Sequence, residues 1–128
     1  MPYIEQTNNV EVEAFPKFLP DQSHPKQSYF FFTYRIRITN KSKKTLKLLS
    51  RHWVITDGHG RSNEVKGEGV VGQTPTLAPS QSYEYSSFCP LPTPTGNMRG
   101  SYFFKSDNGE QIEAKIPLFF LRDLSQLH

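Results

Sequence analysis

The chain has 128 residues, a size typical of a single domain that buries enough surface to fold without disulfides or a structural metal. Its only cysteine, Cys89, excludes an intramolecular disulfide, and no apolar stretch approaches the roughly 20 residues that a transmembrane helix needs. The 15 Lys and Arg residues are spread along the chain, so the formal charge of +3 gives no strong nucleic-acid signal.

The first third of the chain carries two strand signals. Val10, Val12 and Ala14 alternate with glutamates, which predicts a strand that ends at the proline-containing turn of residues 18–21. The clearest signal covers residues 29–40, where apolar residues occupy the even positions and Thr or Arg several of the odd ones. This segment is predicted to be a strand with one buried and one solvated face.

The next predicted strand, residues 46–57, contains an irregularity. Its apolar residues shift from even to odd numbers near Leu48 and Leu49, which indicates a β-bulge. The glycines of residues 57–60 predict a tight hairpin that leads into a returning strand at residues 61–66.

Three further strands are expected toward the C-terminus, at residues 81–88, 99–105 and 112–118. The last two are joined by residues 107–109 (Asp-Asn-Gly), the strongest hairpin signal in the chain. In the last strand the inward positions are predicted to be Ile112, Ala114, Ile116 and Leu118.

About seven short strands separated by turns predict an all-β fold, an antiparallel β-sandwich of the immunoglobulin or fibronectin type III-like kind. We expect one domain over residues 1–121 and a short C-terminal tail over residues 122–128.

Gly67, Gly69 and Gly72 have the GxGxxG spacing of dinucleotide-binding proteins. Prolines shortly after them, at positions 75 and 79, leave no room for the helix that such a site requires, which excludes a Rossmann fold. Two interpretations stay open. The glycines form a purely structural loop, or they form a nest of N–H groups that binds an anion with help from Lys66 and Arg51.

No residue pattern indicates an enzyme. Cys89 has no histidine within ten residues, and no Gly-x-Ser-x-Gly elbow is present. The histidines lack the spacing of metal ligands, so no metal or cofactor is predicted; they are His24, His52, His59 and His128. Several carboxylates fall on the polar phase of their strands and are predicted to be solvated; they are Glu11, Glu13, Glu84 and Glu113.

Three motifs have an order and spacing that resemble the ApaG family, also called CorD. They lie at residues 51–57 (RHWVITD), 67–72 (GEGVVG, followed by Pro75) and 94–100 (PTGNMRG). The resemblance covers roughly residues 8–121. Ser80 departs from the family, whose members often have glycine there, and this predicts a differently shaped turn.

The resemblance implies a fibronectin type III-like sandwich. Bacterial members of the family are stand-alone proteins without an assigned biochemical activity, linked genetically to cobalt resistance and magnesium efflux. Similar domains in eukaryotic F-box proteins and in a DNA-polymerase-interacting protein are usually regarded as protein-binding. The glycine motif of the family has prompted suggestions of nucleotide or pyrophosphate binding.

These observations predict a non-enzymatic binding module that contacts another protein through residues 51–56 and 66–75, with His52, Trp53 and Arg99 on the contact surface. The single thiol and the lack of an export signal favour the cytoplasm. The alternative is a nucleotide- or pyrophosphate-binding protein that uses the glycine loop. The sequence does not decide between a monomer and a homodimer.

Overall fold

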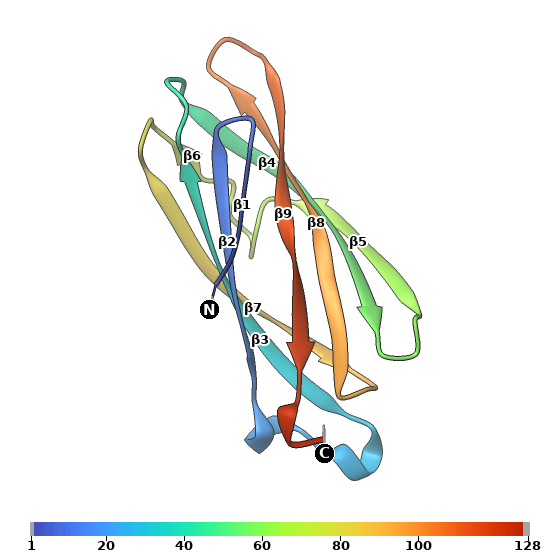
Figure 1. Cartoon of the computed structure of the whole chain (residues 1–128). Helices are drawn as coiled ribbons and strands as arrows, with labels where there is room; N and C mark the ends of the chain where they lie inside the picture. Colours follow the sequence, from blue (N-terminus) through green and yellow to red (C-terminus); the bar gives the residue numbers. More distant parts are fainter. Residues whose placement is uncertain (1, 127–128) are drawn as a thin grey trace.

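The computed structural model describes residues 2–126, which form two antiparallel sheets packed into a sandwich (Figure 1). The first sheet has the order β1 (Tyr3–Thr7), β2 (Val10–Phe18), β3 (Phe30–Asn40), β7 (Ser82–Leu91). The second has the order β5 (Ser62–Glu68), β4 (Leu46–Asp57), β8 (Thr95–Ser106), β9 (Gln111–Arg122), and β6 (Thr76–Leu77) pairs with the start of β4.

Three short 3₁₀ turns complete the described chain: η1 (Pro20–Gln22), η2 (Pro25–Gln27) and η3 (Leu124–Gln126). Among the residues that the structure describes, no helix is long and apolar enough to cross a membrane. In the predicted tail, Arg122 is the last residue of β9 and residues 124–126 form η3, while the last two residues lie outside the described part.

The predicted sandwich is confirmed, with two strands more than expected. All six even-numbered residues of β3 are buried, as the alternation predicts. The predicted bulge in β4 is confirmed by a shift in its pairing with β8 between Leu48 and Ser50. Because of this shift, Leu48 before the bulge and Trp53 after it both reach the core.

Two side chains lie on the opposite side from the one expected. Leu118 is 47% exposed, because β9 contains one extra residue where Met98 pairs with Phe119 and Gly100 with Ile116. The bulge turns Phe119 inward in place of Leu118. Glu13 is buried and not solvated, because the unexpected strand β1 lies beside it and Arg37 contacts it at 2.7 Å.

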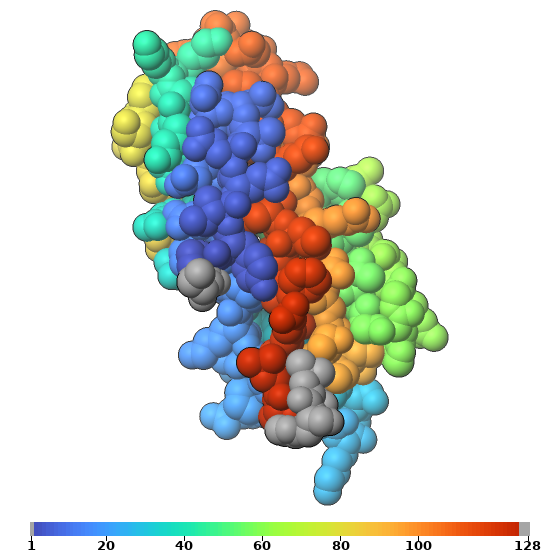
Figure 2. All heavy atoms as spheres, viewed as in Figure 1, coloured from blue at the N-terminus to red at the C-terminus, as the bar shows by residue number. Residues whose placement is uncertain are grey.

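The two long sides of the sandwich differ. On one side the turn after β1 covers the edge of β9: Asn8 Nδ2 donates to the carbonyl of Glu113 at 2.8 Å, and the N–H of Lys115 donates to Thr7 Oγ1 at 3.2 Å. In Figure 2 the blue N-terminal hairpin lies directly against the red β9. On the other side β5 pairs with β4 alone and β7 with β3 alone, so this side is open.

The core contains tyrosine hydroxyls as well as apolar groups. Those of Tyr85 and Tyr102 hydrogen-bond to each other across the two sheets. Burial raises the pKa of Tyr34, Tyr85 and Tyr102 above the ordinary value of 10.0.

We therefore expect the free energy of unfolding to fall in alkali. The unfolded chain releases these phenolic protons from about pH 10, whereas the folded chain retains them to higher pH, so their contribution is complete below pH 10 and is lost above it. Urea-unfolding midpoints between about pH 8 and pH 11 measure this effect. Tyr102→Phe should flatten the decline, whereas Tyr29→Phe, at an exposed position, should leave it unchanged. A midpoint that is constant up to pH 11 would contradict the argument.

Candidate functional site

The glycine motif forms the end of β5 and a tight hairpin after it. The N–H of Val70 donates to the carbonyl of Gln73 at 2.8 Å, and the N–H of Gln73 returns a bond to Val70 at 2.9 Å. Between them, Val71 and Gly72 both have positive φ values, 47° and 76°. Two such residues enclosed by reciprocal bonds make a two-residue turn of the I′ type, in which Asn-Gly is the preferred pair.

Arg51 anchors this loop from the neighbouring strand β4. Its Nη1 donates to the carbonyl oxygens of Glu68 at 2.9 Å and Gly69 at 3.0 Å. A Cβ on Gly67 would lie 2.7 Å from the same nitrogen, so a side chain at this position would displace the guanidinium group from its place. The N–H of Gly69 also donates to Leu49 at 2.8 Å, which ties the loop to β4 a second time.

The structure brings Arg51 and the glycines together, but in a different arrangement from an anion nest. The loop presents carbonyl oxygens to Arg51, and the N–H groups of Gly69, Val70 and Gln73 each donate to a backbone carbonyl. Lys66 pairs with His52, one position away from the pairing of Gly67 with Arg51, so it projects from the other face of the sheet. The two predicted cationic partners therefore do not converge.

The outer face of the second sheet carries the other predicted residues. His52 Nε2 lies 2.9 Å from Glu64 Oε1, and beside them Lys66 and Arg99 are exposed. The prediction that Trp53 belongs to this surface is wrong. Its side chain is 3% exposed, because it points into the core and packs edge-on against Phe119 with ring centroids 5.9 Å apart.

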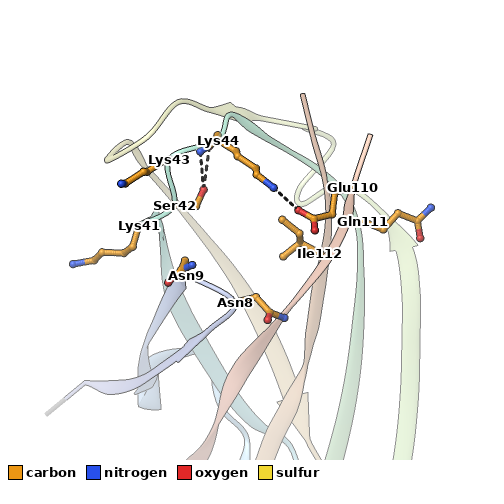
Figure 3. A pocket seen from close by; sticks show the side chains of 9 residues that line it. All are labelled: Asn8, Asn9, Lys41, Ser42, Lys43, Lys44, Glu110, Gln111 and Ile112. Carbon is orange, nitrogen blue, oxygen red and sulfur yellow. Dashed lines mark hydrogen bonds and ion pairs between the residues drawn. The ribbon is translucent and has the colours of Figure 1, made fainter. Parts of the chain in front are cut away.

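A hollow lies at the end of the sandwich, between the β1–β2 turn, the β3–β4 loop and the start of β9 (Figure 3). It has a volume of about 590 Å³. Lys44 reaches Glu110 at 2.8 Å, while Lys41 and Lys43 point away from Glu110 (Figure 3). The lysine charges therefore do not converge on this hollow.

Within residues 2–126 the candidate metal ligands do not cluster, and the cysteine is buried. In this range no three His, Cys, Asp or Glu side chains are close enough together to hold a metal ion, and His128 lies outside the described residues. Burial raises the pKa of the Cys89 thiol to about 11, and the side chain is 4% exposed. It is therefore a protonated, structural thiol at neutral pH.

Sequence reasoning missed Val71. Its side chain is 61% exposed at the tip of the loop, and its φ of 47° is unfavourable for a β-branched residue. In the sequence, Val71 is marked only by the glycine that follows it. A residue before glycine indicates a two-residue turn when the flanking residues, here Val70 and Gln73, are known to pair.

Comparisons with known proteins agree with this architecture. Residues 20–106 match the family model described as ApaG domain. The chain belongs to the ApaG family. It is 49% identical to Protein ApaG of Paramagnetospirillum magneticum, over 93% of this chain and 92% of the relative.

Solved structures show the same relationship. A crystal structure of an ApaA protein from Bordetella pertussis superposes with a TM-score of 0.85 at 46% identity and covers 94% of both chains. The C-terminal domain of Wzt shares the fold alone, with a TM-score of 0.55 at 6% identity over 94% of this chain and 77% of that domain.

Removing the Arg51 anchor should loosen the glycine loop. Arg51→Ala leaves two carbonyl oxygens without their charged donor, which we expect to lower the free energy of unfolding by about 1–2 kcal/mol. Hydrogen–deuterium exchange should rise at residues 67–73 and not across the rest of the sandwich. Arg61→Ala is the control, because Arg61 is exposed and its guanidinium group enters no ion pair or hydrogen bond within the described chain; its backbone N–H bond to Asp57 is kept in the variant. Unchanged exchange in Arg51→Ala would show that the loop does not depend on this anchor.

The buried thiol gives a second expectation. A thiol reagent at about pH 8 should label Cys89 slowly in the native protein and rapidly after unfolding, since both burial and the raised pKa suppress the thiolate. Mass spectrometry of the labelled protein measures the two rates. Similar rates in both states would indicate an accessible, reactive cysteine.

Proposed function

We propose that this ApaG-family chain is a non-enzymatic, cytoplasmic binding module that contacts another protein. The contact surface comprises the tip of the glycine loop and the adjoining outer face of β4, β5 and β8. The conformation and exposure of Val71 carry this proposal.

Val71 combines two features that folding alone does not require. A left-handed conformation costs an L-residue roughly 1–2 kcal/mol, and Asn or Gly would adopt it more easily. The strained residue is also an apolar side chain that is 61% exposed and buries little surface in this chain. Strain that persists at an exposed position is typical of a binding site, where a partner supplies the missing contacts.

The loop is held firmly enough to present this side chain. Arg51 fixes two of its carbonyl oxygens, and Gly69 is bonded to β4. A preorganised loop loses less conformational entropy when it binds. Beside it, six of the seven residues of β5 are exposed, and the His52–Glu64 pair and Arg99 supply polar groups on the outer face of the sheet.

The nucleotide interpretation stays a prediction, and no contact in the loop favours it over protein binding. Most of the loop N–H groups are already bonded, and Arg51 already serves the loop carbonyls. The link to cobalt and magnesium implied by the family resemblance likewise stays a prediction.

A single substitution separates binding from folding. Val71→Asn creates the preferred Asn-Gly turn, so it should raise the free energy of unfolding by about 1 kcal/mol. The same substitution removes the apolar contact, so the partner should be recovered less efficiently. Chemical crosslinking and quantitative mass spectrometry of the tagged protein in its own cells measure the recovery, and thermal unfolding measures stability.

Ile4→Thr is the matched control. Ile4 is another apolar side chain, 55% exposed, on strand β1, so its loss should leave partner recovery unchanged. Equal recovery with wild type, Val71→Asn and Ile4→Thr would overturn the proposed surface. A less stable Val71→Asn protein would instead remove the strain argument on which the proposal depends.

A further inference from the structure

The described structure has four edge strands, and they differ in how their free edges are protected. Unpaired backbone groups at a sheet edge can pair with another chain, so natural proteins shorten, cover or charge their edges. Strand β1 is only five residues long, and β9 is covered by the turn after β1. Strand β5 carries Glu64, Lys66 and Glu68 along its edge.

Strand β7 lacks these protections along most of its length. It has ten residues, no Lys or Arg, and one carboxylate, Glu84. Its five even-numbered side chains are all exposed, and no strand of the described chain pairs with its second edge. Figure 1 shows it with β3 as its neighbour in the sheet. Its one edge-blocking residue is Pro90, near the C-terminal end.

The direction of the backbone groups follows from the pairing with β3. The N–H of Asn40 donates to the carbonyl of Gln81, and bonded positions recur at every second residue of an antiparallel pair. The odd-numbered residues of β7 therefore face β3. The N–H and C=O groups of residues 82, 84, 86 and 88 face solvent, and Pro90 lacks an N–H on this same side.

Charge and register favour a second copy of the same strand as the occupant. An antiparallel pair centred on Ser86 places Glu84 opposite Phe88 of the other copy and Ser82 opposite Pro90. A pair centred on Glu84 would oppose two carboxylates, and one centred on Phe88 would move Pro90 into the bonded stretch. In the Ser86 register Glu84 keeps its own cations, Arg35 at 3.3 Å and Arg37 at 3.8 Å.

The aromatic residues beside this edge complement that register. Phe88 is 62% exposed and stacks on Phe31, with ring centroids 5.5 Å apart and an interplanar angle of 19°. In the pair centred on Ser86, each Phe88 lies next to the Glu84–Arg35 ion pair of the other copy. The contact buries an exposed ring and covers the aliphatic part of the arginine.

We propose that two copies of this chain associate through β7, pairing antiparallel across a two-fold axis at Ser86 to form one continuous sheet of eight strands. The pairing uses no residue of the glycine loop, so the proposal does not rest on the partner surface proposed above. A single strand pair gives an interface at or below the low end of the range for specific complexes, about 1,200 Å². We therefore expect a dimer that dissociates on dilution.

The oligomeric state tests the edge. Sedimentation velocity of the wild type over a range of concentrations should show a mass that rises from 14.7 kDa toward twice that value. Ser86→Pro removes one N–H group from the free edge of β7 and leaves every hydrogen bond between β7 and β3 in place. We therefore expect this variant to stay monomeric. Ser62→Pro makes the same change at the first residue of the charged edge strand β5 and should still dimerise. Circular dichroism and thermal unfolding verify that both variants are folded.

Cysteine trapping tests the register and does not depend on whether the proline variant folds. Under mild oxidation Ser86→Cys should form a disulfide-linked dimer, since residues opposite each other at the axis lie within disulfide reach. Ser82→Cys, on the same exposed edge but far from its counterpart, should not. Buried Cys89 is common to both variants.

Three results would overturn the proposal. The first is a wild-type protein that is monomeric at every concentration, which would leave the edge to a segment of a different protein. The second is dimerisation that survives Ser86→Pro, because the interface must then lie elsewhere. The third is equal crosslinking of the two cysteine variants, which would exclude the Ser86 register.

Discussion

The edges of the two sheets impose the constraint from which the shape of this molecule and the two contacts proposed for it follow. Each sheet has two edge strands whose outward N–H and C=O groups must be paired, covered or left in water. On one side the β1–β2 turn bonds to β9 and closes the sandwich. On the other, the glycine loop leads from β5 to β6 within the second sheet, residues 78–81 cross to the first sheet, and β5 and β7 are left apart. The exposed, partner-accessible features of β5, β7 and the loop between β5 and β6 all result from that one open side.

The crossing between the sheets depends on a buried asparagine. Asn40 at the end of β3 is fully buried, and its Nδ2 donates to the carbonyls of Lys44 at 2.7 Å and Leu77 at 3.0 Å. Its Oδ1 accepts from the N–H and hydroxyl of Ser42. One side chain thus joins the end of β3 in the first sheet to β6, which pairs with β4 in the second. All its polar groups are bonded, so its burial stabilises the crossing instead of opposing it.

Elements with a strict period of two could be predicted from the sequence, because one face of each is buried. Strand β3 belongs to this class. The bulge in β4 is visible as a break in the same period, and the Asp-Asn-Gly hairpin could be predicted from its turn residues. The strands that were missed lack such a face: β1 alternates between half-buried and exposed residues, and β6 has only two residues. The inward turn of Phe119 depends on a mismatch between β8 and β9 that neither strand shows alone. For the same reason the contact between Arg51 and Gly67 required the pairing of β4 with β5.

The non-glycine residues with positive φ differ in what their strained backbone does for the fold. The residues concerned in the described chain are Asn8, Asn9, Ser28, Val71 and Ser80. The two asparagines tolerate this region and form the β1–β2 turn. Ser28 caps η2 by donating its N–H to Pro25, and Ser80 donates its N–H to Asn40 at 2.7 Å and so holds the crossing in place. The two serines are thus compensated by bonds within the fold. Val71 is the one β-branched residue of the set, and its side chain lies largely in water. The bonds between Val70 and Gln73 hold its backbone in this conformation. The exposed side chain that they present is the feature on which the proposed partner contact depends.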